Sequence, residues 1–499
     1  WITQQELCMA TNAAGVEYEA VSEPYAETEN SADNRKDISD RLLRIHNVTS
    51  NRFWQFAALT GLLFALGIIG FVLRLASGFD DKDAWGYYVA VFAFLMTTTS
   101  AAPMVAIAPR IANAHWRRPI SRAAELWTVA GCLNLILYIP LIWLLPSLEN
   151  GRRSLWFYGQ QASKEQFWTG FESVPAYSPH IWVTLAIVAL VVLGLALVWL
   201  SCLPDFAVMR DQGIGWRQKW GRRLSLGWIG TSRQWNWQYH RMGVVGAFYF
   251  MMLIFVHFFI SVEFLMVHVP GWIDSLYPIT HAHNALQAGV ATMMLTLFCL
   301  RQFGGYKDYI GLDQFWSLGK LLLALSLLWF WFWFSSFNLF WYAKKPSELS
   351  LLELLVAGPY RIMFIAEFLL VFIIPWFSMI WNPVRRSVWG PAVIAVSVLL
   401  GTLLDRIRLY VASWDVAGHT FEFSSMLEME MHEVPDKIVT PAIADIFLIV
   451  GFIGGSIFIF MLASRLMPVM NIWEQKEFLL YKAEAQYHRV KVVVLGKSR

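Results

Sequence analysis

The chain has 499 residues, of which 57% are hydrophobic and only 15% are charged, and its net charge is +3. A soluble protein of this length needs more charge to cover its surface, so the composition excludes that class and predicts a membrane protein with several spans. The nearly balanced charge does not indicate nucleic-acid binding. Residues 1–40 are polar and rather acidic, and do not look like a signal peptide.

Runs of about 20 mostly apolar residues mark helices that cross a bilayer, and we expect roughly ten of them. They lie at 53–76, 85–112, 123–146, 180–203, 242–267, 276–300, 316–342, 351–381, 388–412 and 439–464. The sequence therefore predicts an all-α membrane protein with about ten transmembrane helices. An N-terminal segment, 1–52, precedes the spans and a tail, 466–499, follows them.

Basic residues concentrate in alternate loops. The segment before the first span, the loops after the second, fourth, sixth and eighth spans, and the tail are all rich in Arg and Lys. The loop 413–438 is acidic instead. Because cytoplasmic loops carry the excess of Lys and Arg, we predict that both termini are cytoplasmic. The loop 268–280 then faces the opposite, positive side of the membrane.

The most informative stretch joins the fifth span to the sixth and contains a carboxylate and several imidazoles. Ionisable groups at membrane depth are costly, so a functional role is the default interpretation. A quinone site needs a base for the hydroquinone hydroxyls and an apolar, aromatic slot for the ring. We predict Glu263 and His281 as the catalytic, proton-accepting residues. The predicted quinone-binding residues are His257, His268, Trp272, Tyr277 and His283.

Two other interpretations of this stretch stay open. In one, His257 pairs with His281 or His283 on facing helices to ligate a haem; in the other, these are polar side chains solvated at helix ends. The four cysteines form no CxxC, CxxCH or cluster, so we expect no iron–sulfur cluster and no covalent haem in this chain. We also predict no metal site.

Four further ionisable residues lie inside later spans and could form a proton path across a second bundle. They are Glu367, Asp405, Arg406 and Asp445. The alternative is a set of buried ion pairs, for example Glu367 with Arg361. Asp405 and Arg406 are adjacent on a helix and point in two directions, so we expect each to need its own partner.

The hairpin between the second and third spans is basic, and its charges mainly set topology. Within it we expect Glu125 to pair with Arg122 or Arg118.

Three places give the chain a resemblance to the NrfD/PsrC family, the cofactor-free integral membrane subunits of polysulfide-reductase-type complexes. An acidic residue followed by Pro-Gly-Trp, from Glu263 to Trp272, resembles one family signature, although family members more often carry Asp there. The basic hairpin with Ser121 to Glu125 resembles a second signature. The stretch from Gly401 to Arg406 resembles the penultimate-helix motif.

This resemblance implies two four-helix bundles flanked by extra helices, with 53–267 as the first bundle region and 268–465 as the second with the last helices. It implies a menaquinol or ubiquinol site near the positive side of a bacterial inner membrane. Electrons would pass to an iron–sulfur subunit and on to haem c subunits, beside a second membrane subunit of the same family. Because ten spans are expected rather than eight, the chain is most similar to the larger family members, which belong to alternative complex III. There, quinol oxidation is linked to a role in proton translocation.

Two other classes of function stay open. A proton-coupled secondary transporter would use Glu367, Asp405 and Asp445 as carriers, although such transporters usually show broken helices at the midplane. A structural membrane anchor would use the same polar groups only to fix helix packing.

Overall fold

The computed structural model describes residues 29–47, 50–79, 83–144, 180–269, 271–272, 274–417, 434–487 and 490–495. It is an all-α membrane protein, as predicted. Among these residues, eight helices are long and apolar enough to cross a membrane. They are Asn51–Ala76, Ser121–Leu144, His180–Gln212, Ser232–His268, Tyr277–Phe303, Leu312–Ala343, Arg361–Met379 and Ile443–Leu466. Most of the acidic loop that supports the predicted orientation, 418–433, lies outside the described residues.

The other two expected spans are helical but divided. The first is split into α4 (Gly86–Thr98) and α5 (Met104–Ile111). Between them, Thr99 donates to the carbonyl of Leu95 four residues back, a bond that bends helices, and Pro103 has no amide hydrogen. All of α4 is buried, so protein surrounds this helix. The second comprises α17 (Trp389–Arg406), the π-helical segment η8 (Ile407–Val411) and α18 (Ala412–Ala417).

The eighth expected span begins ten residues later than its apolar pattern predicts, at Arg361. Pro359 disfavours helical backbone at Gly358, which ends the preceding segment. The elements here are α13 (Pro346–Leu352), π-helical η6 (Glu353–Ala357), α14 (Arg361–Phe368), π-helical η7 (Leu369–Ile373) and α15 (Ile374–Met379).

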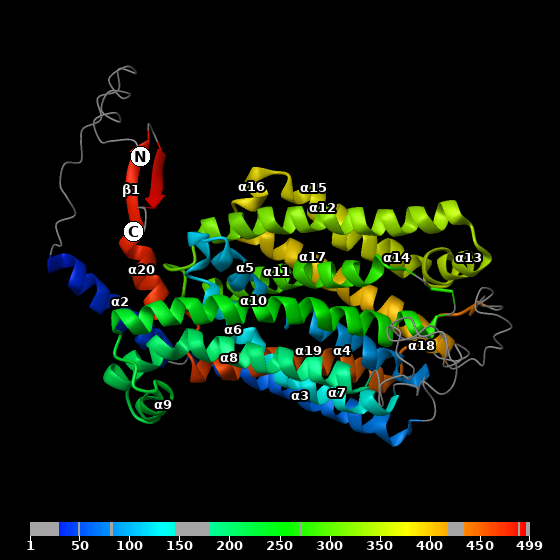
Figure 1. Ribbon diagram of the computed structural model, residues 1–499, viewed down its shortest axis with the longest axis horizontal. Coiled ribbons are helices and arrows are strands. Elements are labelled where there is room, and N and C mark those ends of the chain that lie inside the picture. Colours follow the sequence, from blue (N-terminus) through cyan, green and yellow to red (C-terminus); the bar gives the residue numbers. More distant parts are fainter. Residues whose placement is uncertain are drawn as a thin grey trace, which may run out of the picture. The chain divides into compact units, whose positions relative to one another are not determined.

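The helices pack as two bundles. The first contains α4 with α5, α6 (Ser121–Leu126) with η3 (Trp127–Ala130) and α7 (Gly131–Leu144), α8 (His180–Gln212) and α10 (Ser232–Glu263). The second contains α11 (Tyr277–Phe303), α12 (Leu312–Ala343), α14 with α15, and α17. Helix α11 packs against α10 and α4, so it joins the two bundles (Figure 1).

The first and last spans, α3 (Asn51–Ala76) and α19 (Ile443–Leu466), pair with each other. Their backbones meet where Gly67 faces Gly451, and a Cβ added at Gly451 would overlap the Gly67 backbone. Arg74 and Asp445 form an ion pair at one end of this contact.

The remaining elements lie outside the two bundles and the α3–α19 pair. They are α2 (Glu29–Asn47), η1 (Asp83–Trp85), η2 (His115–Arg117), α9 (Trp216–Leu224), η5 (Met266–His268), α16 (Asn382–Arg385), α20 (Ile472–Tyr481) and the antiparallel strands β1 (Lys482–Tyr487) and β2 (Val490–Leu495). Helices α9 and α20 lie at the end of the bundles where α10 begins, whereas α13 and α18 lie at the other end (Figure 1).

Candidate functional site

A cavity of about 720 Å³, including the space at its mouth, opens in the second bundle beside the start of α11. One wall carries Trp272 and Tyr277, whose rings are 4.8 Å apart. Trp329, Trp333 and other aromatic and leucine side chains of α12 and η6 form the rest of the apolar lining. Mostly apolar walls with polar groups gathered at one end are typical of a site for a small organic molecule.

The polar end of the cavity is an ion network. The Arg408 guanidinium donates to Glu367 at 2.8 Å and to Asp405 at 3.2 Å. Arg406 donates to the other oxygen of Asp405 at 2.8 Å and to the Asn284 carbonyl oxygen at 3.0 Å. Two acids balance two guanidinium groups, so the network is neutral as a whole.

Two π-helical segments adjoin this network. Glu367 lies two positions before η7, which begins at Leu369, and Arg406 directly precedes η8. Such bulges occur mostly inside α-helices and often at functional sites, because the extra residue re-aims the side chains around it.

Three buried donors in the cavity wall make no hydrogen bond within the described part of the chain. They are the indole nitrogen of Trp272, the hydroxyl of Tyr277 and the amide nitrogen of Asn284. An unpaired buried donor costs about 1–3 kcal/mol, so this wall suits an occupant with acceptor oxygens. A quinone or quinol ring with its oxygens meets that description.

A chain of side chains leads from the cavity into the interior. His281 lines the cavity, and its Nε2 lies 3.0 Å from the Tyr410 hydroxyl. Its Nδ1 lies 3.1 Å from Nδ1 of His257 on α10. One of these facing nitrogens carries the hydrogen, so two tautomeric arrangements satisfy the contact. Because the two imidazoles touch, they leave no space for a haem plane between them.

The structure brings together six of the predicted site residues. Trp272, Tyr277, His281, Glu367, Asp405 and Arg406 line the cavity. His257 lies directly behind His281. The residues predicted for ring binding and those predicted for a separate proton path therefore share one site.

The other predicted residues do not line this cavity. Glu263 ends α10 and is fully buried. His268 packs on Trp414 with ring centroids 5.0 Å apart, and Nε2 of His283 lies 2.8 Å from the Leu325 carbonyl oxygen. Asp445 pairs with Arg74 and accepts from the Ala442 amide at the start of α19.

Of two expected pairings, one is confirmed and one is wrong. Asp405 and Arg406 each have a partner of their own, Arg408 and Asn284, and they also contact each other. The partner of Glu367 is Arg408, while Arg361 is exposed.

The sequence analysis missed Asn284, Arg408 and Tyr410. The spacing from His281 to Asn284 and from Asp405 to Arg408 is three residues, which places each pair on one helix face. That spacing was the available signal.

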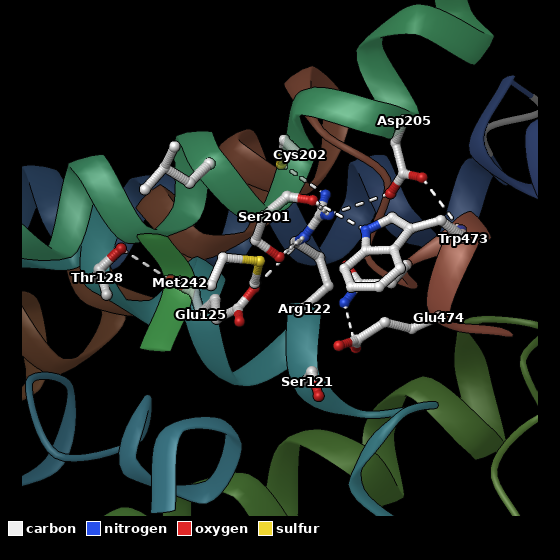
Figure 2. Close-up of polar contacts among 12 residues, drawn as sticks. Ser121, Arg122, Glu125, Thr128, Ser201, Cys202, Asp205, Met242, Trp473 and Glu474 are labelled. Atoms are coloured by element: carbon white, nitrogen blue, oxygen red, sulfur yellow. Dashed lines mark hydrogen bonds and ion pairs between the residues drawn. The ribbon is translucent and has the colours of Figure 1, made fainter. Parts of the chain in front are cut away.

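A second buried ion cluster joins α6, α8 and α20 (Figure 2). Arg122 of α6 reaches α8, where it contacts the Ser201 carbonyl oxygen, Cys202 and the Asp205 carboxylate. Asp205 also accepts from the backbone amides of Ile472 and Trp473, both at 3.3 Å. This cluster therefore fixes α20 to the first bundle.

Glu474 of α20 completes the cluster. It accepts from Arg117 at 2.6 Å and lies 3.5 Å from Arg110. Burial opposes its charge, but Arg117 and Arg110 prevail and lower the pKa of Glu474 from 4.5 to about 2. Glu125 pairs with Arg110 at 2.6 Å, and Arg122 lies farther away at 3.6 Å. The expected Arg118 is not its partner, since Arg118 pairs with Glu477.

Comparison of the chain with protein-family models gave no match, and comparison with curated proteins gave none either.

Proposed function

We propose that this protein is a membrane subunit that binds and oxidises quinol, menaquinol or ubiquinol, for an electron-transfer complex. The observation that carries the proposal is the cavity, where an aromatic slot and unpaired buried donors adjoin His281 and the Glu367 carboxylate. These are the parts that ring binding and proton removal need. The family resemblance of the sequence supports the same function, in a role like that of the ActC subunit of alternative complex III; an ActF-like structural or proton-conducting role is the neighbouring alternative.

The position of each residue in the cavity determines its proposed role. The aromatic side chains at Trp272 and Trp333 flank the ring, and the donors of Tyr277 and Asn284 bind its oxygens. His281 accepts a quinol proton at Nε2, the nitrogen that the Tyr410 hydroxyl also contacts, and gives up the hydrogen on its Nδ1 to the facing Nδ1 of His257. Oxidation releases two electrons to an iron–sulfur partner and two protons, of which the second falls to the Glu367 carboxylate. Haem c subunits would carry the electrons onward.

The orientation of the protein in the membrane is part of the same proposal. Because basic residues concentrate in alternate loops, we propose that this end of the bundles lies on the positive side of a bacterial inner membrane and that both termini are cytoplasmic. Glu263, the other proton acceptor expected from the sequence, lies outside the cavity lining. His281 is therefore the proposed acceptor of the first proton.

A pair of histidine variants tests the proposal in the purified complex. His281→Asn removes the base at the cavity and should slow quinol oxidation roughly 100-fold or more, while quinone still co-purifies. His283→Asn is the matched control, because His283 lies two residues away and contacts the Leu325 carbonyl instead. Normal turnover of the His281 variant would remove its catalytic role. A wild-type complex that binds no quinone would contradict the function itself.

A proton-coupled transporter is a second candidate, favoured by the π-helical segments beside the buried Glu367–Arg408–Asp405 network. A colourless protein that purifies alone, and acidifies proteoliposomes only when a solute is supplied, would support it over quinol oxidation.

A further inference from the structure

The segment between α8 and α10 has an unusual charge pattern. From Gln212, through this segment and along α10 to Val262, the chain contains no Asp or Glu. The basic residues in that range are Arg217, Lys219, Arg222, Arg223, Arg233 and Arg241. The nearest acid, Asp211, is neutralised by Arg210, which contacts both of its oxygens at 2.8 and 3.0 Å. The net charge of this surface is therefore strongly positive.

This segment is held in one position by close backbone packing. At Gly221, in the middle of α9, an added Cβ would lie 2.6 Å from the Arg210 amide nitrogen and 2.8 Å from the Phe206 carbonyl oxygen. Gly215, Gly227 and Gly230 have positive φ and make the turns on either side of the helix. The Gln234 side-chain oxygen accepts from the backbone amides of Ile229, Gly230 and Thr231 and closes the loop before α10. Helix α9 is thus folded against the end of α8.

The outward face of this segment combines cations with apolar side chains. Lys219, Arg222 and Arg223 are exposed. On the same helix, Trp216 and Trp220 are 45% and 44% exposed. Single apolar side chains project from the loops, including Ile214 at 78% and Ile229 at 74% exposed.

A hollow opens between the end of α8, the loop before α10, the start of α10 and α20. Trp228, Trp235 and Trp473 line it, together with Lys476 of α20. The Trp228 and Trp235 rings pack edge to face at 5.1 Å, and Trp235 and Trp473 are 5.4 Å apart. Tryptophan at this level of a membrane protein is typical of the headgroup region.

We infer that α9 and its flanking loops, Gln212–Thr231, form a binding surface for the headgroups of anionic phospholipids. Cations supply the electrostatic attraction, while Trp216, Trp220 and the projecting isoleucines enter the boundary between headgroups and acyl chains. The apolar side chains are scattered among charges rather than gathered in one patch, which suits a lipid surface better than a protein interface. This inference is independent of the proposed quinol chemistry.

The test compares two neutralised variants of the full-length protein, purified in mild detergent and exposed to mixed phosphatidylglycerol and phosphatidylcholine. Arg222→Gln with Arg223→Gln removes two exposed charges from α9. Lys344→Gln with Lys345→Gln removes two exposed charges at the other end of the bundles and is the matched control. The measurement is the binding of each lipid by native mass spectrometry.

Each basic side chain at an anionic surface strengthens attraction roughly fivefold, so the α9 variant should bind phosphatidylglycerol roughly 25-fold more weakly than the wild type. The control variant should bind it as the wild type does, and salt should weaken the wild-type preference. Equal binding by the α9 variant, or an equal loss in the control, would overturn the inference. So would a variant that keeps its lipid and loses a protein subunit, which would assign the surface to an acidic protein.

Discussion

The two buried ion clusters use the same side chains in different surroundings. The Arg408 network joins two acids to two guanidinium groups, and the Arg122 cluster joins three acids to three. The Arg408 network lines a cavity with unpaired donors in its wall. Arg122 and Asp205 are instead fully enclosed between α6, α8 and α20, as Figure 2 shows.

This difference teaches that a buried ion pair does not by itself indicate function. Both clusters stabilise the contact between segments distant in sequence, and either would be strongly destabilised by a change that leaves a buried charge without a partner. Only the Arg408 network also presents charged groups to a space that a substrate can enter. Substitutions in each cluster can therefore separate a structural role of the Arg122 cluster from a chemical role of the Arg408 network.

The largest effect should follow from Arg122→Leu. The change leaves the Asp205 carboxylate buried without its guanidinium, which should lower the free energy of unfolding by about 3–5 kcal/mol. Thermal unfolding of the purified protein measures the loss. Adding Asp205→Leu should restore part of it, but not all, because Asp205 also accepts from the start of α20. A single variant as stable as the wild type would show that this cluster contributes little.

Acid should release α20 from the same cluster. The pKa of Glu474 is about 2 in the folded protein and 4.5 ordinarily, so its charge stabilises the fold above pH 4.5. That contribution, about 3 kcal/mol at most, is lost as the pH falls from 4.5 towards 2. Hydrogen exchange of residues 472–478 should rise over that window in the wild type. In Glu474→Gln the exchange should be raised already at pH 6; protection that does not depend on pH in the wild type would contradict the assignment.

In the Arg408 network, Glu367→Gln should fold and fail to turn over. Arg408 keeps Asp405 as a partner and the amide keeps a hydrogen-bond acceptor, so the loss of stability should be small. Loss of the second proton acceptor should slow quinol oxidation about 100-fold. Glu353→Gln, at an exposed position in η6, is the control. An active Glu367 variant would reduce this network to a structural role like that of the Arg122 cluster.

The sequence predicted the fold better than the site. Long apolar runs place the spans directly, because bilayer thickness sets their length. The division of the second span at Thr99 to Pro103 and the later start at Arg361 depend on local bonds and a proline, which run length does not register.

Within the site, residue type predicted Trp272, Tyr277 and His281, but helix rotation decided which polar groups meet. Helix α10 is apolar on all sides, so no stripe in the sequence tells which face Glu263 occupies. The contact of Glu367 with Arg408 joins residues 41 positions apart, across π-helical segments that change the angle of each side chain. Such a pairing depends on tertiary packing and was not predictable from spacing alone.

The smallest effect should come from a substitution at Trp272, a residue that the sequence correctly predicted to lie at the site. Trp272→Phe keeps an aromatic ring at the cavity wall and removes the unpaired indole donor. One hydrogen bond to a quinone oxygen contributes about 0.5–1.5 kcal/mol, so the dissociation constant should rise roughly three- to tenfold. Titration of the complex with quinone, followed by fluorescence quenching, measures it. Trp331→Phe, at a tryptophan that is 63% exposed on α12, is the matched control and should bind quinone normally. Equal affinities in both variants would mean that the indole nitrogen of Trp272 does not contact the ligand.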